Sequence, residues 1–502
     1  MVHGAPQWPV LELVLVRILF VDIDTLRPDH LGCYGYHRAT SPNIDEIARR
    51  GIRFTNAYAS DVPCLPSRTA LVTGTFGIRN GVNNHGGAAA DLASRGADRT
   101  FFNQWVTNSL PRCWPEPGCT PPRSRASRCA MAPTGGAEDS ASRWTSPPAT
   151  ASSGPIRSYP VRWTGSIAGD GPRTGSSTCT CGTRTRRTTL PLRSATPSPA
   201  IVSRRGIPSR FAPAIGSSPV PTRPRNRGGF RPDEWGPPGP RSPWNLADAD
   251  DVKQMFDGYD TGLRYAEEAV GVLANRLADL DVLDTTAIWI SSDHGEGFGD
   301  LRVYADHQGA DEATTHIPAV LSWPGLPASV QTGLAYHLDV AATVVDLAGA
   351  RRPSDWDGIS VREAVQAGTD APGREHLVLT QGAWTAQRGV RTGDHLYLHT
   401  RHDGFHASWP DEMLFDVVAD PHEQVDLASD DVATTTALGT YLDEWIGVEL
   451  ARSYARQDPL TTIVEEGGPF HVRGHLPAYL DRLRDTGRGR WISTIAERHP
   501  TD

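Results

Sequence analysis

One long interval, residues 106–225, lacks the spacing of apolar residues that builds a hydrophobic core, and it splits the chain into two parts. Pro, Arg, Ser, Thr and Gly dominate this interval, and no amphipathic period runs through it. Its 17 Arg face four acidic residues, a balance of +13, whereas the rest of the chain sums to −22. Apolar residues with helix or strand spacing lie before and after it. Any folded core must therefore be built from two segments that are distant in sequence.

The segment before the interval has the alternation of an α/β fold. Residues 17–23 are an apolar run that predicts a buried first strand, 44–51 a helix and 54–58 a short strand. A turn that contains Cys64 follows, and then a helix over 67–73. Because open α/β sheets carry their sites at the carboxyl ends of strands, we expect functional groups in these loops.

The segment after the interval continues this pattern. The apolar spacing over 250–280 predicts a long helix that faces a core, and 287–290 a buried strand. Asp293 and His294 come directly after that strand, and a helix is expected over 337–348. A buried strand that delivers a carboxylate and an imidazole to one loop predicts a functional site there.

Length and charge limit the class of protein. With 502 residues the chain is long enough for two domains, and its net charge of −9 argues against a nucleic-acid-binding protein. The apolar run from Val10 to Ile23 is interrupted by Glu12, Arg17 and Asp22, so no membrane span is expected. This run also lacks a basic leader and a small-residue cleavage site. We therefore expect a cytoplasmic protein that binds neither nucleic acid nor a membrane.

The cysteine turn carries a motif. It reads Val62-Pro63-Cys64-Leu65-Pro66-Ser67-Arg68-Thr69-Ala70-Leu71-Val72-Thr73-Gly74. A Cys followed by x-Pro-Ser-Arg resembles the modification signature of the type I sulfatases, in which this Cys is oxidised during synthesis to formylglycine. The resemblance implies that a formylglycine-generating enzyme modifies Cys64 and that the hydrated aldehyde is the nucleophile. Its second hydroxyl lets sulfate leave by C–O cleavage, an exit that a serine lacks. Arg68 lies about one helical turn further on, where its guanidinium suits an anion.

A metal site is the second part of the resemblance. Asp24 opens Asp24-Thr25-Leu26-Arg27-Pro28-Asp29-His30, which resembles the N-terminal sulfatase motif, and Asp293-His294 matches the family's second metal pair. The resemblance implies a divalent metal bound by Asp24, Asp293, His294 and the modified Cys64. Such an oxygen-rich set suits calcium, with magnesium or manganese as alternatives. We expect Asp22 to point to the other face of the strand.

Further candidates surround this set. His307 falls where sulfatases place a Lys or His on the ester oxygens, and it could donate a proton to the leaving alcohol. Asn84 and His85 are candidates for the substrate pocket. The family's Lys-x-His pair after the cysteine helix cannot be located, because Lys253 is the only lysine of the chain.

The resemblance covers roughly residues 17–100 and 230–430 and implies a fold class. We expect an alkaline-phosphatase-like, doubly wound α/β/α sandwich with a smaller C-terminal α+β domain. We expect an N-terminal extension over 1–16 and the first part of the catalytic domain over 17–105. An Arg/Pro/Ser-rich segment over 106–228 follows. The second part of the catalytic domain is expected over 229–350 and the C-terminal domain over 351–502.

The Arg/Pro/Ser-rich segment has two interpretations, a disordered basic insertion or a segment translated out of frame. One lysine against 48 arginines indicates GC-rich coding, in which out-of-frame sequence is rich in Arg, Pro, Ala, Gly and Ser. The codons that can encode residues 177–189 can also be read in a shifted frame that starts at the third nucleotide of each codon. In that frame they can encode Asp-Leu-His-Val-Arg-Asp-Pro-His-Thr-Pro-Tyr-His. This contains the Asp-Pro-His-x-Pro-Tyr of many sulfatases.

The same offset also gives sulfatase-like sequence over 111–122 and 220–226. We therefore hypothesise two compensating frameshifts, near residues 105–110 and 225–230. If they are present in the gene, the product lacks central strands of the sheet and is catalytically impaired.

The predicted function is hydrolysis of sulfate esters of a small molecule or a glycan by formylglycine and a divalent metal. The nearest rival is a phosphonate or phosphate monoester hydrolase, since relatives share the nucleophile and the metal. A rival of another class is the impaired product just described. The residues fix neither the substrate nor the oligomeric state.

Overall fold

The computed structural model describes residues 17–93, 109–110, 177–181, 246, 248–453, 457–485 and 487–500. A large mixed sheet has the strand order β10-β2-β8-β5-β1-β4, with β9 beside β2. Its strands are β1 (Arg17–Ile23), β2 (Ile52–Tyr58), β4 (Ser177–Cys181), β5 (Thr286–Ser291), β8 (His316–Ser322), β9 (Ser329–Gln331) and β10 (Ala335–Tyr336). Among them β8 alone is antiparallel to its neighbours, so the other strands end at the same edge of the sheet.

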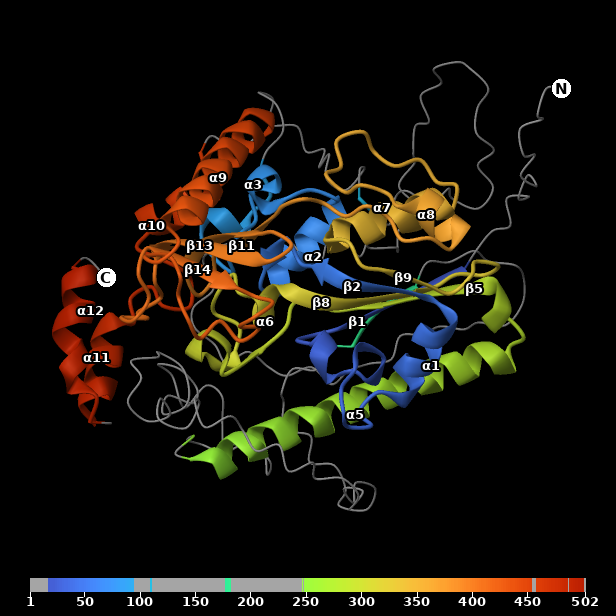
Figure 1. Cartoon of the computed structure of the whole chain (residues 1–502), viewed down its shortest axis with the longest axis horizontal. Helices are drawn as coiled ribbons and strands as arrows, with labels where there is room; N and C mark the ends of the chain where they lie inside the picture. Colours follow the sequence, from blue (N-terminus) through green and yellow to red (C-terminus); the bar gives the residue numbers. More distant parts are fainter. Residues whose placement is uncertain are drawn as a thin grey trace, which may run out of the picture.

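Helices cover both faces of this sheet (Figure 1). One face carries α2 (Cys64–Thr73), α7 (His337–Leu347) and α8 (Arg362–Ala367), and the other carries α1 (Pro42–Arg50) and α5 (Ala249–Asp279). Side chains of β1 alternate between the two layers. Ile18 belongs to the apolar cluster that contains Val344 of α7, whereas Val21 belongs to the cluster that contains Leu263 of α5. This sandwich confirms the predicted doubly wound α/β/α class.

Most predicted elements lie within a few residues of their expected bounds. The long helix expected over 250–280 is α5, and the helix expected over 337–348 is α7. The helix expected to start at Ser67 begins at Cys64 instead. Cys64 is therefore the first residue of α2 rather than part of a preceding turn.

The strand β4 lies at one edge of the large sheet and comes from the Arg/Pro/Ser-rich interval, where the sequence shows no strand spacing. It pairs in parallel with β1, with Val21 opposite Cys179. Residues 109–110 and β4 are the only parts of 106–228 that the structure describes. The remaining predictions for this interval, and the extension at 1–16, lie outside the described residues.

A smaller sheet of five strands has the order β14-β13-β12-β11-β3. Its strands are β3 (Asp61–Val62), β11 (Leu377–Gln381), β12 (Ala386–Arg391), β13 (His395–His402) and β14 (Glu412–Asp416). The helix α9 (Val432–Arg452) covers one face, where Leu438 and Leu442 pack against Val390 and Leu414. The opposite face packs toward the large sheet, through contacts that include Leu379 and Tyr58.

The two sheets meet directly before the cysteine. The chain leaves the large sheet at the end of β2, and β3 pairs with β11 in the small sheet, with Val62 opposite Gln381. Cys64 follows two residues later. The start of α2 is thus fixed from both sheets.

The C-terminal helices α10 (Pro459–Glu465), α11 (Leu476–Asp485) and α12 (Ile492–Arg498) follow α9. Tyr479 of α11 stacks on Phe405, beyond the end of β13. Asp403 accepts hydrogen bonds from Arg498 and His499, each at 2.7 Å. These contacts attach the last helix to the small sheet.

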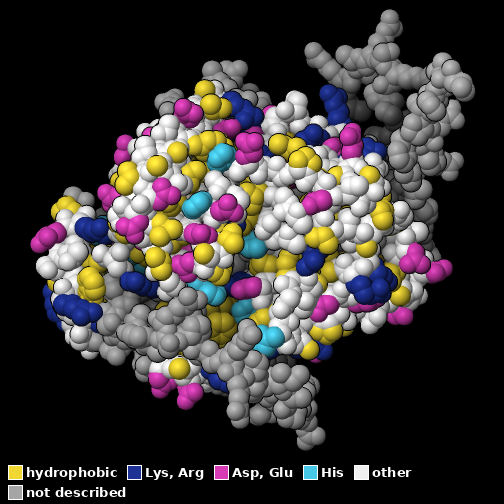
Figure 2. All heavy atoms as spheres, in the orientation of Figure 1, with side chains coloured by type: hydrophobic (Ala, Val, Ile, Leu, Met, Phe, Trp, Pro, Cys, Tyr) yellow, Lys and Arg dark blue, Asp and Glu magenta, His cyan; other side chains and the backbone are white. Residues whose placement is uncertain are grey.

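Acidic and basic side chains are interspersed over the face shown in Figure 2, and the described residues form no continuous basic patch on it. Among the described residues, no helix combines the length and the apolar character that crossing a membrane requires.

Candidate active site

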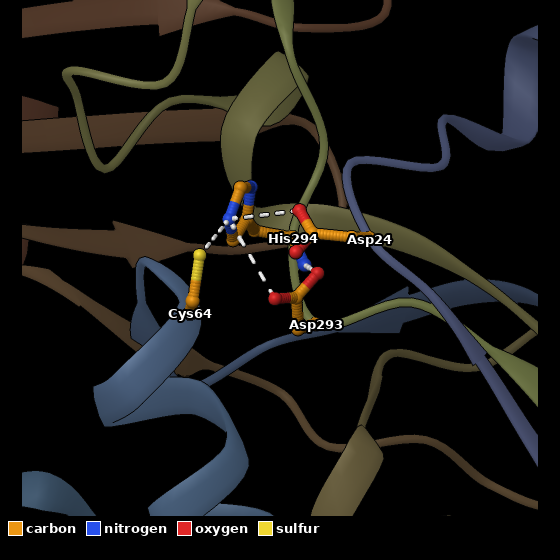
Figure 3. A group of neighbouring side chains, drawn as sticks. All are labelled: Asp24, Cys64, Asp293 and His294. Carbon is orange, nitrogen blue, oxygen red and sulfur yellow. Dashed lines mark hydrogen bonds and ion pairs between the residues drawn. The ribbon is translucent and has the colours of Figure 1, made fainter. Parts of the chain in front are cut away.

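Cys64 lies at the first turn of α2, against the end of β5. Its Sγ is 3.1 Å from His294 Nε2 (Figure 3). His294 Nδ1 donates to the carbonyl oxygen of Gly295 at 2.8 Å, so the ring is held with Nε2 toward the cysteine. Burial, and next the charges of Asp293 and Asp24, raises the pKa of the Cys64 thiol. An unmodified Cys64 is therefore a poor source of thiolate at neutral pH.

Parallel strands bring the acidic residues to the same edge. Asp24 follows β1 and Asp293 follows β5, and β1 and β5 are parallel neighbours. The ligand atoms of Asp24, Cys64, Asp293 and His294 lie within 4.8 Å of one another. Figure 3 shows all four side chains pointing to one small space. The residues that the sequence proposed as metal ligands are thus neighbours in the fold.

Arg68 occupies the centre of the acidic residues. Its guanidinium lies 2.9 Å from Asp22, 3.2 Å from Asp24 and 2.8 Å from Asp293. The expectation that Asp22 points away from the site is wrong. Residues two apart on a strand share a face, and the even-numbered side chains of β1 face the layer of α2.

Carboxyl groups outnumber the guanidinium in this group by three to one. Burial, and next the charge of Asp293, raises the pKa of Asp22 to about 7. Burial also opposes ionisation of Asp293, but the charges of His294 and Arg68 outweigh it and lower the pKa of Asp293. Burial opposes protonation of His294, but the charges of Asp293 and Asp24 outweigh it and raise the pKa of His294. Binding of a divalent cation would displace protons from His294 and Asp22, and three carboxylates around one guanidinium would then leave negative charge that the cation neutralises.

The donor set fits a divalent cation. Asp293 Oδ2 is buried and makes no hydrogen bond among the described residues, although it faces Arg68. Asp24 and Asp293 supply hard oxygen ligands, and an oxygen on a modified Cys64 would stand where Sγ stands now. His294 Nε2 adds one nitrogen ligand.

His307 lies beside the candidate metal ligands. Its ring centroid is 4.2 Å from that of His294, and its Nδ1 is 3.3 Å from a carboxylate oxygen of Glu296. Burial and the His294 charge lower the pKa of His307, but Glu296 and Asp306 outweigh them and the net shift is upward. This position is compatible with a proton donor. The sequence did not single out Glu296, although it follows His294 by only two residues.

His85 is also near the cysteine, with its Nε2 3.5 Å from the backbone nitrogen of Leu65. Its Nδ1 is 2.8 Å from Nε2 of His471, which lies after α10. Asn84 is buried and accepts hydrogen bonds from the backbone N–H groups of His85 and Phe470. No local pattern could have found His471, because its connection to the site spans 386 residues.

A mixed sheet between two helical layers, with candidate metal ligands at one edge, is an arrangement of the alkaline-phosphatase-like fold. The family model described as Sulfatase matches residues 17–107 and 174–350, just over half of the chain. The chain therefore belongs to the sulfatase family, whose members use formylglycine and a divalent metal. The second matched block begins inside the interval 106–228 and includes β4.

Two human sulfatases are among the similar proteins. Arylsulfatase A is 38% identical over 86 residues, which are 16% of this chain and 17% of that protein. Iduronate 2-sulfatase is 25% identical over 361 residues, 63% of this chain and 61% of that protein. The chain thus spans between about a sixth and three fifths of the length of these relatives.

Solved structures share the fold over most of the chain. A 2-O GAG sulfatase aligns with a TM-score of 0.56 and 16% identity, covering 86% of this chain and 92% of that one. The phosphonate monoester hydrolase of Agrobacterium radiobacter aligns with a TM-score of 0.53 and 19% identity, covering 87% and 96%. The fold is therefore shared by sulfate and phosphonate ester hydrolases.

Proposed function

We propose that the protein hydrolyses sulfate monoesters, with formylglycine made from Cys64 by a formylglycine-generating enzyme. One observation carries this proposal. The cysteine of a sulfatase modification signature lies within 4.8 Å of two aspartates and a histidine at the edge of the sheet. The substrate is an ester of a small alcohol or of a glycan.

The metal that we propose is calcium, with magnesium or manganese as alternatives. Asp24, Asp293, His294 and the modified Cys64 would hold it, and bound calcium would polarise the sulfate and lower the pKa of the attacking hydroxyl. Arg68 balances the carboxylates and supplies a fixed positive charge for the anionic substrate. His307, oriented by Glu296, donates a proton to the oxygen of the leaving alcohol.

A phosphonate or phosphate monoester hydrolase is the alternative, since such an enzyme shares this fold. Parallel assays on 4-nitrophenyl sulfate and 4-nitrophenyl phenylphosphonate test it, and we expect the higher kcat/KM on the sulfate. A higher kcat/KM on the phosphonate would reverse the assignment. Mass measurement of the Cys64 peptide tests the modification, which lowers the residue mass by about 18 Da. An unmodified Cys64 in the native host would exclude the proposed nucleophile.

We further propose that the interval 106–228 arises from two compensating frameshifts. The end of the family match at residue 107 is consistent with the first shift. The match resumes at residue 174, inside the interval, so it does not support a second shift near 225–230. If the shifts belong to the gene, this product is an impaired enzyme, and if they are errors of sequencing the enzyme is whole. Resequencing across 100–235 decides it, and a single frame without insertions or deletions would remove the proposal.

A further inference from the structure

Three stretches of chain meet beside the start of α2 and carry aromatic and imidazole side chains. His471 Nε2 contacts His85 Nδ1 at 2.8 Å, and the His471 ring stacks on Trp384 with centroids 4.4 Å apart. Phe470 lies against Gly86, where an added Cβ would be 2.3 Å from the phenyl ring. We call His85, Trp384, Phe470 and His471 the aromatic wall.

The wall is held in place by hydrogen bonds between these stretches. The backbone N–H of His471 donates to the carbonyl of Ala383 at 3.0 Å. The backbone N–H of Ala88 donates to Glu466 at 2.9 Å, and that of Phe470 to the Asn84 side chain at 3.3 Å. The wall is therefore a built surface rather than a loose loop.

The wall adjoins the nucleophile and is open to solvent. His85 Nε2 lies 3.5 Å from the nitrogen of Leu65, the residue after Cys64. His85, Trp384 and His471 are partly exposed, and the Phe470 side chain is 47% exposed. An exposed phenyl ring beside a catalytic centre offers apolar contact area to whatever the centre binds.

The wall carries no positive charge at neutral pH. Burial, and next the neighbouring His471, lowers the pKa of His85 well below its usual range. Burial and the His307 charge lower the pKa of His471 to about 3. Among the described residues, the arginines that follow Trp384 and His471 most closely are already paired, Arg388 with Asp458 and Arg473 with Glu466. Further sulfate or carboxylate groups on a substrate would find no free cation in the wall.

We infer that the aromatic wall binds the alcohol part of the ester and selects an uncharged leaving group with a flat apolar face. This inference rests on the proposed ester hydrolase activity and names its substrate class. Phe470 and the stacked Trp384–His471 pair supply ring surfaces for such a group. The scissile ester is left to Cys64, Arg68 and His307.

The test uses the full-length protein with formylglycine confirmed by mass. Its substrates are 4-nitrophenyl sulfate and 3-carboxy-4-nitrophenyl sulfate, which share a ring and differ in charge. We expect wild type to favour the uncharged ester by about tenfold in kcat/KM, and Phe470→Ala to lower kcat/KM on that ester about fivefold through KM. Tyr265→Ala, which removes an equally exposed aromatic from α5, is the matched control and should change neither value.

A second variant is assessed by the ratio of its activities on two substrates, which does not depend on how much of the protein is folded. His471→Lys adds a cation to the wall, so the ratio of charged to uncharged substrate should rise at least about fivefold. Equal use of both esters by wild type, or a ratio that His471→Lys does not move, would overturn the inference.

The same two leaving groups are also measured as methylphosphonate monoesters. Turnover of phosphonates without sulfates would overturn the proposed sulfatase activity. The leaving-group ratio on whichever ester is hydrolysed would still decide the role of the wall.

Discussion

Two clusters of histidine and carboxylate side chains in this molecule look alike by proximity and differ in charge. Asp24, Cys64, Asp293 and His294 form one, and His402, Asp403 and His499 form the other, each with ligand atoms within 4.8 Å. Each cluster also contacts an arginine. Proximity of ligand types alone would assign a metal to both.

Charge separates them. At the active site one guanidinium, that of Arg68, faces three carboxylates. In the C-terminal cluster the single carboxylate of Asp403 accepts from Arg498, His499 and the backbone of Phe405. The first cluster has negative charge left for a cation, whereas the second is satisfied and attaches α12 to the small sheet. An excess of carboxylate charge, more than the presence of ligands, marks a metal site.

The largest effect is expected at Cys64. Cys64→Ala removes the source of the proposed nucleophile and should lower kcat by at least about 10³-fold, since single removals of a nucleophile cost that much or more. The measurement is turnover of 4-nitrophenyl sulfate, with thermal unfolding as a control for the fold. Activity within tenfold of wild type would contradict the proposed nucleophile.

Arg68→Ala comes next. It leaves the buried carboxyl groups of Asp22 and Asp293, and the partly exposed one of Asp24, without their partner. It should destabilise the metal-free protein by about 3–5 kcal/mol, the usual cost of breaking a buried ion pair. Urea unfolding with and without calcium measures this, and calcium should restore part of the loss. Calcium that stabilises the variant no more than wild type would contradict an excess of carboxylate charge at this site.

Asp293→Asn tests which cluster binds metal. It removes a ligand, so calcium affinity measured by titration calorimetry should fall at least about 100-fold, beyond the 10–100-fold cost of outer-shell changes. His499→Ala, which alters the C-terminal cluster, is the matched variant and should keep one metal per chain. If His499→Ala lost the metal and Asp293→Asn kept it, the C-terminal cluster and not the candidate active site would be the metal site.

The smallest effect concerns acid stability. Burial opposes ionisation of Asp403, but His499, His402 and Arg498 outweigh it and lower its pKa from 3.8 to about 2. A carboxyl with a depressed pKa stabilises the fold above its unfolded pKa, and this stabilisation is lost as the pH falls from about 4 to about 2. It amounts to about 2 kcal/mol.

Urea midpoints at pH 7 and pH 3 measure this contribution. Asp403→Asn should flatten the acid dependence, whereas Asp443→Asn, at an exposed position of α9, should leave it unchanged. If the urea midpoint of Asp403→Asn fell between pH 7 and pH 3 as much as that of wild type, the charge of Asp403 would not stabilise the C-terminal cluster.

Local patterns predicted the elements around the nucleophile well. The apolar run of β1, the spacing in α5 and the residues after β5 are short-range signals, and parallel strands then place Asp24 and Asp293 at one edge. The prediction that Asp22 faces away from Asp24 was wrong, because residues two apart on a strand point to the same face. This error could have been avoided. The sequence did contain the needed information there.

Other features depend on contacts that no local pattern encodes. His471 reaches the site from the far end of the chain, and its pairing with His85 follows from how the small sheet and the last helices pack. The strand β4 lies in an interval without strand periodicity and is recognised only by its pairing with β1. The C-terminal cluster of His402, Asp403 and His499 likewise joins residues almost a hundred positions apart in the sequence.

The contact between Cys64 and His294 can form only after both residues have been synthesised. These residues are 230 positions apart. At about 5–20 residues per second, a ribosome needs roughly 10 to 50 s to travel from one to the other. For that period the cysteine has emerged without the strand, carboxylate and imidazole that later enclose it. The formylglycine-generating enzyme that we propose would therefore reach the thiol during an interval set by the order of the gene. This interval ends when β5 is synthesised.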